Sequence, residues 1–278
     1  MQHADDPFRG QDEVPFRNHL GASMIGRQCD RELWYSFVWA KVVSFQGRIL
    51  RLFQRGHLEE VRFVALLRMI NCTVWQHDAN GKQFRIHGAN GHYGGSLDGV
   101  VQGIPECPNE PVLAEFKTHS ANSFAKLESL GVALAKPEHF VQMQCYGRAY
   151  NLKTALYMAV NKDNDDLYAE LITIDPRIGA DFESRALAIT SARVPPPRCS
   201  EEPGYYGCRY CDYSSLCHKG GQYFRSCRTC KSGNPAEDGS WVCSNDAAIA
   251  EAECAGWQDV LELTPVEQYM ACNRYERV

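Results

Sequence analysis

The sequence has no long apolar run, no excess of basic residues and no export signal at its start. No stretch approaches eighteen uncharged apolar residues, so no segment is predicted to cross a membrane as a helix. The first twelve residues carry Asp5, Asp6 and Asp12 and lack the basic and apolar regions of a signal peptide. We therefore expect a soluble, cytoplasmic protein with no membrane partner.

The charge balance excludes a protein coated with basic surface. The formal net charge over 278 residues is −5, so any nucleic acid would have to be held by a local cleft and bound cations. The 44% hydrophobic and 23% charged fractions are typical of a globular protein with a substantial core. The length fits one large domain, or one domain and a small module.

Cysteine, by contrast, is abundant. There are 13 cysteines, an odd number, and several form C-x-x-C pairs near the C-terminus. Without a secretion signal, this pattern indicates metal binding rather than disulfides.

The central feature of the sequence is a pair of short apolar or glycine-rich runs that each carry a carboxylate. Asp98 follows Gly94 and Gly95, and Glu115 and Lys117 lie two residues apart in the run 112–118. If that run is a strand, Glu115 and Lys117 share one face while Val112, Ala114 and Phe116 point the other way. Two carboxylates beside a lysine suit a hard divalent cation and hydrolysis of a phosphodiester. The simpler interpretation is an ordinary strand with a solvated charged face.

Helical patterns flank these strands. An apolar stripe predicts a helix over 46–69, which carries His57 and Glu60, and Pro137 opens a helix that puts Gln142 and Tyr146 on one face. A further helix is expected from Ser23, as N-cap, to Lys41. The remaining predictions are strands at 73–76, 83–86, around Asp98, 154–161 and 167–174, a hairpin turn at Asn80–Gly81, and a helix over 176–192.

In this order, the motifs resemble those of the PD-(D/E)XK nuclease superfamily, RecB-like branch. The resemblance implies an α/β (α+β) restriction-endonuclease-like core, with a central mixed sheet flanked by helices. It implies that Glu60, four residues after Gly56, is the third metal-binding carboxylate, with His57 as runner-up. It also assigns roles to the other motif residues: Asp98, Glu115 and the Phe116 carbonyl as Mg²⁺ or Mn²⁺ ligands, Lys117 as the residue that activates water, and Gln142 and Tyr146 as positioning residues.

Three cysteines near the end of this core, Cys208, Cys211 and Cys217, need a fourth partner from elsewhere to hold a metal. The resemblance to iron–sulfur members of the superfamily, such as CRISPR-associated adaptation nucleases, implies that Cys29 completes a [4Fe-4S] cluster. Cys199 and His218 are rival ligands. Zinc, or free thiols, remain alternatives to the cluster.

A second cysteine group resembles a zinc ribbon, with Cys227 and Cys230 as a knuckle followed by Cys243 and Cys254. The later spacings are irregular, and either Cys272 or His218 could replace Cys254. Such a small module has little core of its own and needs Zn²⁺ to fold.

The sequence thus predicts a mobile arm (1–20), a nuclease domain closed by an iron–sulfur cluster (21–222) and a zinc-ribbon-like module (223–278). We expect a Mg²⁺- or Mn²⁺-dependent DNA exonuclease acting on single strands or ends, in recombination, repair or phage DNA processing. It would work in a bacterial or phage-infected cell, with a protein partner in a recombination or replication complex. The alternative is a catalytically inactive nucleic-acid-binding protein, and a redox sensor built on the cluster ranks last.

Overall fold

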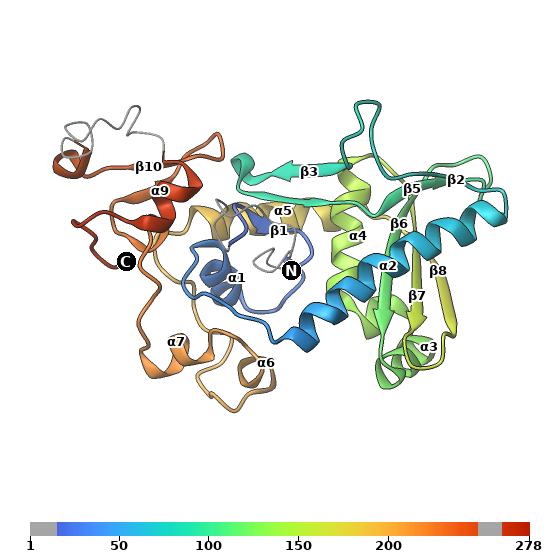
Figure 1. Cartoon of the computed structure of the whole chain (residues 1–278), viewed down its shortest axis with the longest axis horizontal. Helices are drawn as coiled ribbons and strands as arrows, with labels where there is room; N and C mark the ends of the chain where they lie inside the picture. The colour runs from blue at the N-terminus through green and yellow to red at the C-terminus, as the bar shows by residue number, and fades with distance from the viewer. Residues whose placement is uncertain (1–15, 250–262) are drawn as a thin grey trace. The chain divides into compact units, whose positions relative to one another are not determined.

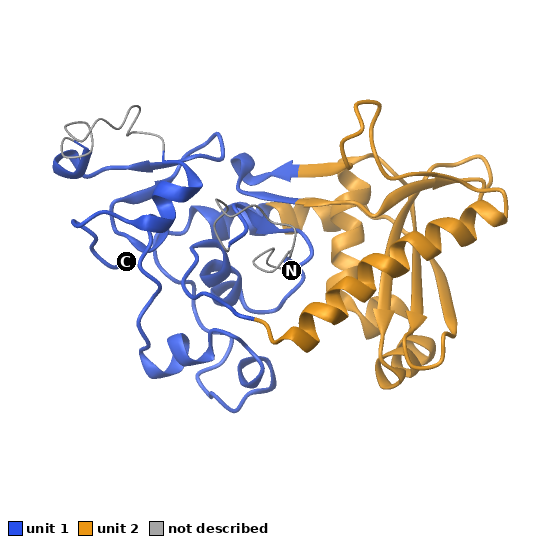
Figure 2. Ribbon diagram, in the orientation of Figure 1, with its two compact units in different colours: residues 1–44, 87–94, 184–278 blue, residues 45–86, 95–183 orange. Residues whose placement is uncertain are grey.

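A computed structural model describes residues 16–249 and 263–278, and these residues fall into two compact units. Unit 1 comprises Met1–Ser44, His87–Gly94 and Ser184–Val278, and unit 2 comprises Phe45–Ile86 and Gly95–Glu183 (Figure 2). Within the predicted N-terminal arm, residues 1–15 lie outside the described part, whereas Phe16 and Leu20 are buried. The predicted boundary at 222/223 falls inside unit 1, and the sequence-based domains remain a prediction.

Unit 2 is built on a mixed five-stranded sheet. Its strands are β2 (Thr73–Trp75), β5 (Gly99–Gln102), β6 (Val112–His119), β7 (Thr154–Asn161) and β8 (Leu167–Thr173), in the order β2-β5-β6-β7-β8. All neighbours are antiparallel except β6 and β7, which are parallel. A parallel pair needs a long crossover, which helices α3 (Ala121–Ala135) and α4 (Pro137–Ala149) supply. The predicted mixed sheet flanked by helices is confirmed.

The two faces of β6 differ in chemistry as the sequence predicted. Helix α2 (Gly47–Met69) covers the apolar face, where Phe63 stacks on Phe116 with ring centroids 5.1 Å apart; Figure 1 shows α2 crossing in front of β6. Ala114, Phe116 and Val160 belong to this core. Burying an aromatic side chain such as Phe63 stabilises the packing by about 2–3 kcal/mol. The other face carries Glu115 and Lys117.

The first predicted helix begins later than expected. Helix α1 spans Asp30–Phe37, with Cys29 rather than Ser23 at its N-cap. The Arg185 guanidinium donates to the carbonyls of Ile25 and Arg27, at 2.5 and 2.6 Å. These contacts accompany turns in the segment before α1, in which the Arg27 N–H donates to the Met24 carbonyl at 2.9 Å.

Asp98 does not lie in a strand, contrary to expectation. Strand β4 (Tyr93–Ser96) ends before it and β5 begins after it. The chain changes partners here, because β4 belongs to a three-stranded sheet of order β1-β4-β3, with β1 (Leu20–Gly21) and β3 (Arg85–Gly88). Asp98 therefore sits in the connection between two sheets. The predicted turn at Asn80–Gly81 is confirmed, with Gly81 at φ +74°.

The elements after β8 belong to unit 1, except that residues 176–183 of α5 belong to unit 2, and all of them but α5 are short. They are α5 (Pro176–Ser191), α6 (Tyr206–Arg209), α7 (Ser214–Lys219), η3 (Cys227–Thr229), β9 (Gly233–Pro235), β10 (Trp241–Cys243) and α9 (Pro265–Met270). One further short helix, η2, spans Ala89–Gly91. Among the described residues, no helix has both the length and the apolar character needed to cross a membrane.

Two glycine substitutions should affect stability in opposite directions. A Cβ at Gly179 would lie 2.7 Å from the Gln144 carbonyl oxygen, whereas a Cβ at Gly56, within α2, would meet nothing within 4 Å. We expect Gly179→Ala to destabilise the protein by about 1–3 kcal/mol through overpacking, and Gly56→Ala to stabilise it by about 0.5–1 kcal/mol. Urea unfolding of both variants measures this. Equal effects of the two would contradict the packing described here.

Candidate active site

Strand β6 places Glu115 at the centre of a polar group on one face of the sheet. The Glu115 side chain is fully buried. Lys117, two residues on, donates to its Oε1 atom, and Gln142 Nε2 on α4 donates to Oε2 at 3.2 Å. Both carboxylate oxygens therefore have a donor, which is what a buried charge requires.

A backbone hydrogen bond attaches Asp98 to the same strand. Its Oδ2 atom accepts from the Phe116 N–H at 2.8 Å. The contact fixes the connection before β5 against β6, so the carboxylate lies close enough to Glu115 and Lys117 to shift the pKa of both. Asp98 thus joins the group although it comes from a loop.

Glu60 is the third carboxylate, and it comes from α2. Burial raises its pKa to about 7, repulsion from Asp98 adds to this, and Lys117 partly offsets it. His57, the alternative from the sequence, has a side chain that is 73% exposed, and its Nδ1 lies 3.7 Å from Glu60 Oε1. The preceding residue, Glu59, instead accepts from Arg62 at 3.0 Å. The structure therefore brings Glu60, and not Glu59, toward Asp98 and Lys117.

The electrostatics of the group favour a bound cation. Burial raises the pKa of Glu115 to about 8; Lys117 opposes the shift, and Asp98 and Glu60 reinforce it. Burial also opposes the charge on Lys117, but the three carboxylates outweigh it and raise the pKa of the lysine. Because the single ammonium does not balance three acids, a divalent cation would stabilise their ionised forms.

The donor set fits Mg²⁺ or Mn²⁺, which prefer carboxylate and carbonyl oxygens. In their present rotamers, the His, Cys, Asp and Glu side chains of the described residues form no group of three or more with the geometry of a bound ion. A cation bound to Glu115 would share that carboxylate with Lys117, so the lysine would have to move aside.

The remaining predicted positioning residue, Tyr146, is on the same helix as Gln142. Only 2% of its surface is exposed, and it follows Gln142 by four residues on α4. Gln142 contacts Glu115 directly. For Tyr146, the structure shows burial beside the site.

Sequence analysis missed a chain of hydrogen bonds next to Lys117. His119 Nε2 and His139 Nδ1 lie 2.8 and 2.9 Å from the Tyr157 hydroxyl, and Ser123 Oγ lies 3.3 Å from His119 Nδ1. Lys136 donates to Ser123. Burial lowers the pKa of His119 to about 4 and that of His139 to about 2, with Lys136 and Lys117 adding to both shifts. Both imidazoles are therefore neutral.

Only one hydrogen bond in the chain has a fixed direction: Lys136 can only donate to Ser123. If the Ser123 proton points to His119 Nδ1, His119 carries its proton on Nε2 and donates to Tyr157, and Tyr157 donates to His139 Nδ1. Two sequence signals could have found the pair: His119 continues the period of two from Lys117, and His139 precedes Gln142 by three residues on α4.

The first cysteine group lines one space in unit 1. Its members come from the α1 N-cap, the loop after α5, α6, the loop that follows it, and α7: Cys29, Cys199, Cys208, Cys211 and Cys217. The four predicted ligands and their rival Cys199 are thus together, with the sulfurs of Cys199 and Cys208 3.8 Å apart. His218, the other rival, also lines this space, and its Nε2 atom is buried without a hydrogen-bond partner in the part of the chain described.

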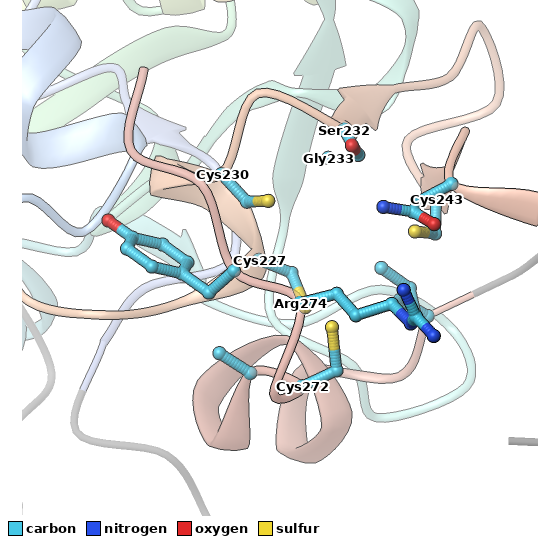
Figure 3. A pocket seen from close by; sticks show the side chains of 11 residues that line it. Cys227, Cys230, Ser232, Gly233, Cys243, Cys272 and Arg274 are labelled. Carbon is cyan, nitrogen blue, oxygen red and sulfur yellow. The ribbon is translucent and has the colours of Figure 1, made fainter. Parts of the chain in front are cut away.

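The second cysteine group lines a separate space, also in unit 1. Cys227, Cys230 and Cys243 are there as predicted, and the fourth cysteine is Cys272 (Figure 3). Cys254, the predicted fourth ligand, lies outside the described residues.

Comparisons with solved structures give distant likenesses. No family model matches the chain, and no curated protein matches it. Among solved structures, "Crystal structure of SSO0001" aligns with a TM-score of 0.40 and 16% identity over 74% of this chain and 88% of that one. LHK-Exo, an alkaline exonuclease from Laribacter hongkongensis, aligns with a TM-score of 0.43 and 16% identity over 62% of this chain and 86% of that one. Its complex with dAMP gives the same TM-score at 17% identity. At this distance the likenesses carry no argument about function.

The raised carboxyl pKa values predict a pH-dependent stability. A carboxyl whose pKa is higher in the folded than in the unfolded state stabilises the fold below its unfolded pKa, and that contribution is lost as the pH rises through the folded pKa. Since Glu60 and Glu115 have folded pKa values of about 7 and about 8, we expect stability to fall as pH rises from about 4.5 to about 8. Since each pKa unit corresponds to about 1.4 kcal/mol, the loss should amount to several kcal/mol without added Mg²⁺ or Mn²⁺.

Urea unfolding across this pH range, for the wild type and Glu115→Gln, measures the effect. The variant should show a shallower fall, because the uncharged amide removes one titrating group. An identical pH profile in the two proteins would mean that Glu115 does not titrate as described.

Proposed function

We propose that the protein is a metal-dependent nuclease that hydrolyses phosphodiester bonds in DNA. The observation that supports this most strongly is the grouping of Glu60, Asp98 and Glu115 around Lys117, with Gln142 bonded to Glu115. An ordinary solvated strand would not bury Glu115, nor bring a helix carboxylate and a loop carboxylate toward it. A module that only binds the phosphate backbone gains nothing from three gathered acids.

The residues have distinct roles in this proposal. Glu60, Asp98 and Glu115, with the Phe116 carbonyl, would hold Mg²⁺ or Mn²⁺, which when bound polarises the phosphate and acidifies a water. Lys117, an ammonium because its pKa is raised, orients the attacking water and donates to the phosphate oxygens as negative charge develops. Gln142 keeps the Glu115 carboxylate in place while Lys117 moves. Tyr146 would act as a positioning residue from within the protein, because its side chain is buried on the same helix as Gln142.

Single-stranded DNA or DNA ends are the proposed substrates. With a net charge of −5, the protein has no broad basic surface to hold a long duplex, so binding must depend on the site itself and on its cations. A DNA end or a single strand can enter such a local site more easily than the middle of a duplex can.

End-labelled single- and double-stranded DNA, incubated with Mg²⁺ or Mn²⁺, tests the proposal. The chain offers a matched pair of variants, because Glu59 and Glu60 are adjacent: Glu59 accepts from Arg62, whereas Asp98 and Lys117 act on Glu60. We expect Glu60→Gln, Asp98→Ala and Lys117→Ala to lose at least about 100-fold in rate. Glu59→Gln should cleave at close to the wild-type rate.

Several outcomes would contradict the assignment. A folded wild type with no metal-dependent cleavage on any of these substrates would favour a nucleic-acid-binding module instead. If Glu59→Gln and Glu60→Gln lost the same factor in cleavage rate, the loss would come from disturbing helix α2 and not from removing a metal-binding carboxylate. The labelled end would reveal the polarity of digestion.

We also propose that the first cysteine group holds a [4Fe-4S] cluster. Five thiols around one space exceed the four that a cluster needs, and the donors fit because iron–sulfur clusters prefer thiolates. Cys29, Cys208, Cys211 and Cys217 would be the ligands, with Cys199 as the spare. In this arrangement the cluster would tie the start of α1 to α6 and α7.

Anaerobic purification followed by iron and sulfide analysis tests this. About four irons per chain are expected for the wild type and for Cys107→Ser, a control in unit 2, and almost none for Cys208→Ser. If Cys199→Ser lost iron and Cys29→Ser retained it, Cys199 would be the fourth cluster ligand and Cys29 the spare thiol. An iron-free wild type from anaerobic, iron-supplemented growth would contradict the cluster.

A further inference from the structure

Four cysteines from three segments far apart in sequence surround a single space in unit 1. Cys227 and Cys230 lie at the two ends of the η3 turn, Cys243 ends β10, and Cys272 follows α9 by two residues. Figure 3 shows the four labelled side chains around this space. The charges that act on Cys227 are those of Cys272, Cys230 and Cys243, so the four thiols are mutual neighbours.

The backbone around these thiols favours thiolates. The Cys272 N–H is directed at the sulfur of Cys227, and the Asn245 N–H at the sulfur of Cys243. Four thiolates gathered around one space repel one another, so a divalent cation would be needed to hold them together, and the two N–H groups would remain donors to the bound sulfurs.

We propose that Cys227, Cys230, Cys243 and Cys272 form a closed, structural Zn²⁺ site. Four thiolates with no carboxylate and no open position are the donors of a structural zinc site, and a C-x-x-C turn followed by a hairpin is a suitable frame. In their present rotamers these thiols, all of them in the described residues, do not form a metal-binding group, so closing the shell would require rotation about χ1, which moves a sulfur without moving the backbone. Cys272, rather than the sequence-predicted Cys254, is the fourth ligand.

The proposed Zn²⁺ site would fix the C-terminal segment, residues 272–278, against η3. After Cys272 the chain runs back along η3: the Lys231 N–H donates to the Glu276 carbonyl at 2.7 Å, and the Val278 N–H donates to the Thr229 carbonyl at 3.0 Å. The β9–β10 hairpin is only three residues on each side. Because this hairpin and the C-terminal segment are short, they bury little apolar surface of their own. A bound metal would therefore contribute directly to their folding.

The metal would also fix a buried arginine between its ligands. Arg228 lies between Cys227 and Cys230 in η3, is 3% exposed, and its guanidinium carbon lies 3.9 Å from the Trp39 ring centroid and 4.7 Å from that of Trp241. It donates to the Phe37 carbonyl and to Gln268. Releasing the η3 turn should therefore change the surroundings of two tryptophans, which gives a signal independent of any enzymatic activity.

The experiment compares Cys272→Ser with Cys254→Ser in the full chain, produced in zinc-supplemented medium. Metal analysis of the purified proteins should give about one zinc per chain for the wild type and for Cys254→Ser, and at least a tenfold lower content for Cys272→Ser. Cys272→His places another zinc-binding side chain at the same position, so it should restore the zinc content. This rescue would show that Cys272→Ser loses zinc because it lacks a ligand and not because it fails to fold.

Tryptophan fluorescence during zinc removal by a strong chelator is the second measurement. The wild type and Cys254→Ser should show a spectral change as zinc leaves, reversed when zinc is returned, while iron bound at the other cysteine group is followed separately. Zinc retained in Cys272→Ser but lost in Cys254→Ser would overturn the assignment of the fourth ligand. A folded wild type without zinc, or zinc loss without any fluorescence change, would overturn the site or its link to Arg228.

Discussion

The arrangement of unit 2 depends on keeping one fully buried carboxylate supplied with hydrogen-bond donors. Glu115 sits in the middle of β6, where no water can solvate it. The carboxyl group is accommodated there because Lys117 and Gln142 each donate to one oxygen, although burial still raises its pKa to about 8. This requires β6 to keep strict alternation and α4 to lie against the face opposite α2. The apolar core and the polar site are thus two sides of the same strand, and a shift of one residue in register would destroy both.

The elements that could be predicted from sequence are those whose own periodicity decides their structure. The alternation in β6 and the apolar stripe of α2 are local patterns, and α4 begins at a proline that suits a first helical turn. The start of α1 could not be predicted, because Arg185 takes the carbonyls of Ile25 and Arg27 from more than 150 residues away. The local helix signal at Ser23 therefore did not predict the start of α1, where Arg185 makes its tertiary contact.

The candidate site followed the same rule. The spacing of Glu115 and Lys117 predicts that their side chains share one face of a strand. The Tyr157 hydroxyl, however, lies near His119 and His139 because β7 pairs in parallel with β6. Asp98 was expected in a strand, and its place at a change of sheets depends on pairing that no local pattern encodes. Likewise Cys272 reaches Cys227, Cys230 and Cys243 from 42 residues beyond Cys230, and spacing along the sequence could not show that it would line the same space.

The hydrogen-bond chain from Lys136 to His139 has a consequence for how charge is kept at the site. Burial lowers the pKa of His119 and His139, and the charges of Lys117 and Lys136 lower both further, so the two imidazoles are neutral. The histidines beside Lys117 therefore add no positive charge to the site. Its carboxylates keep an excess of negative charge that a divalent cation would balance.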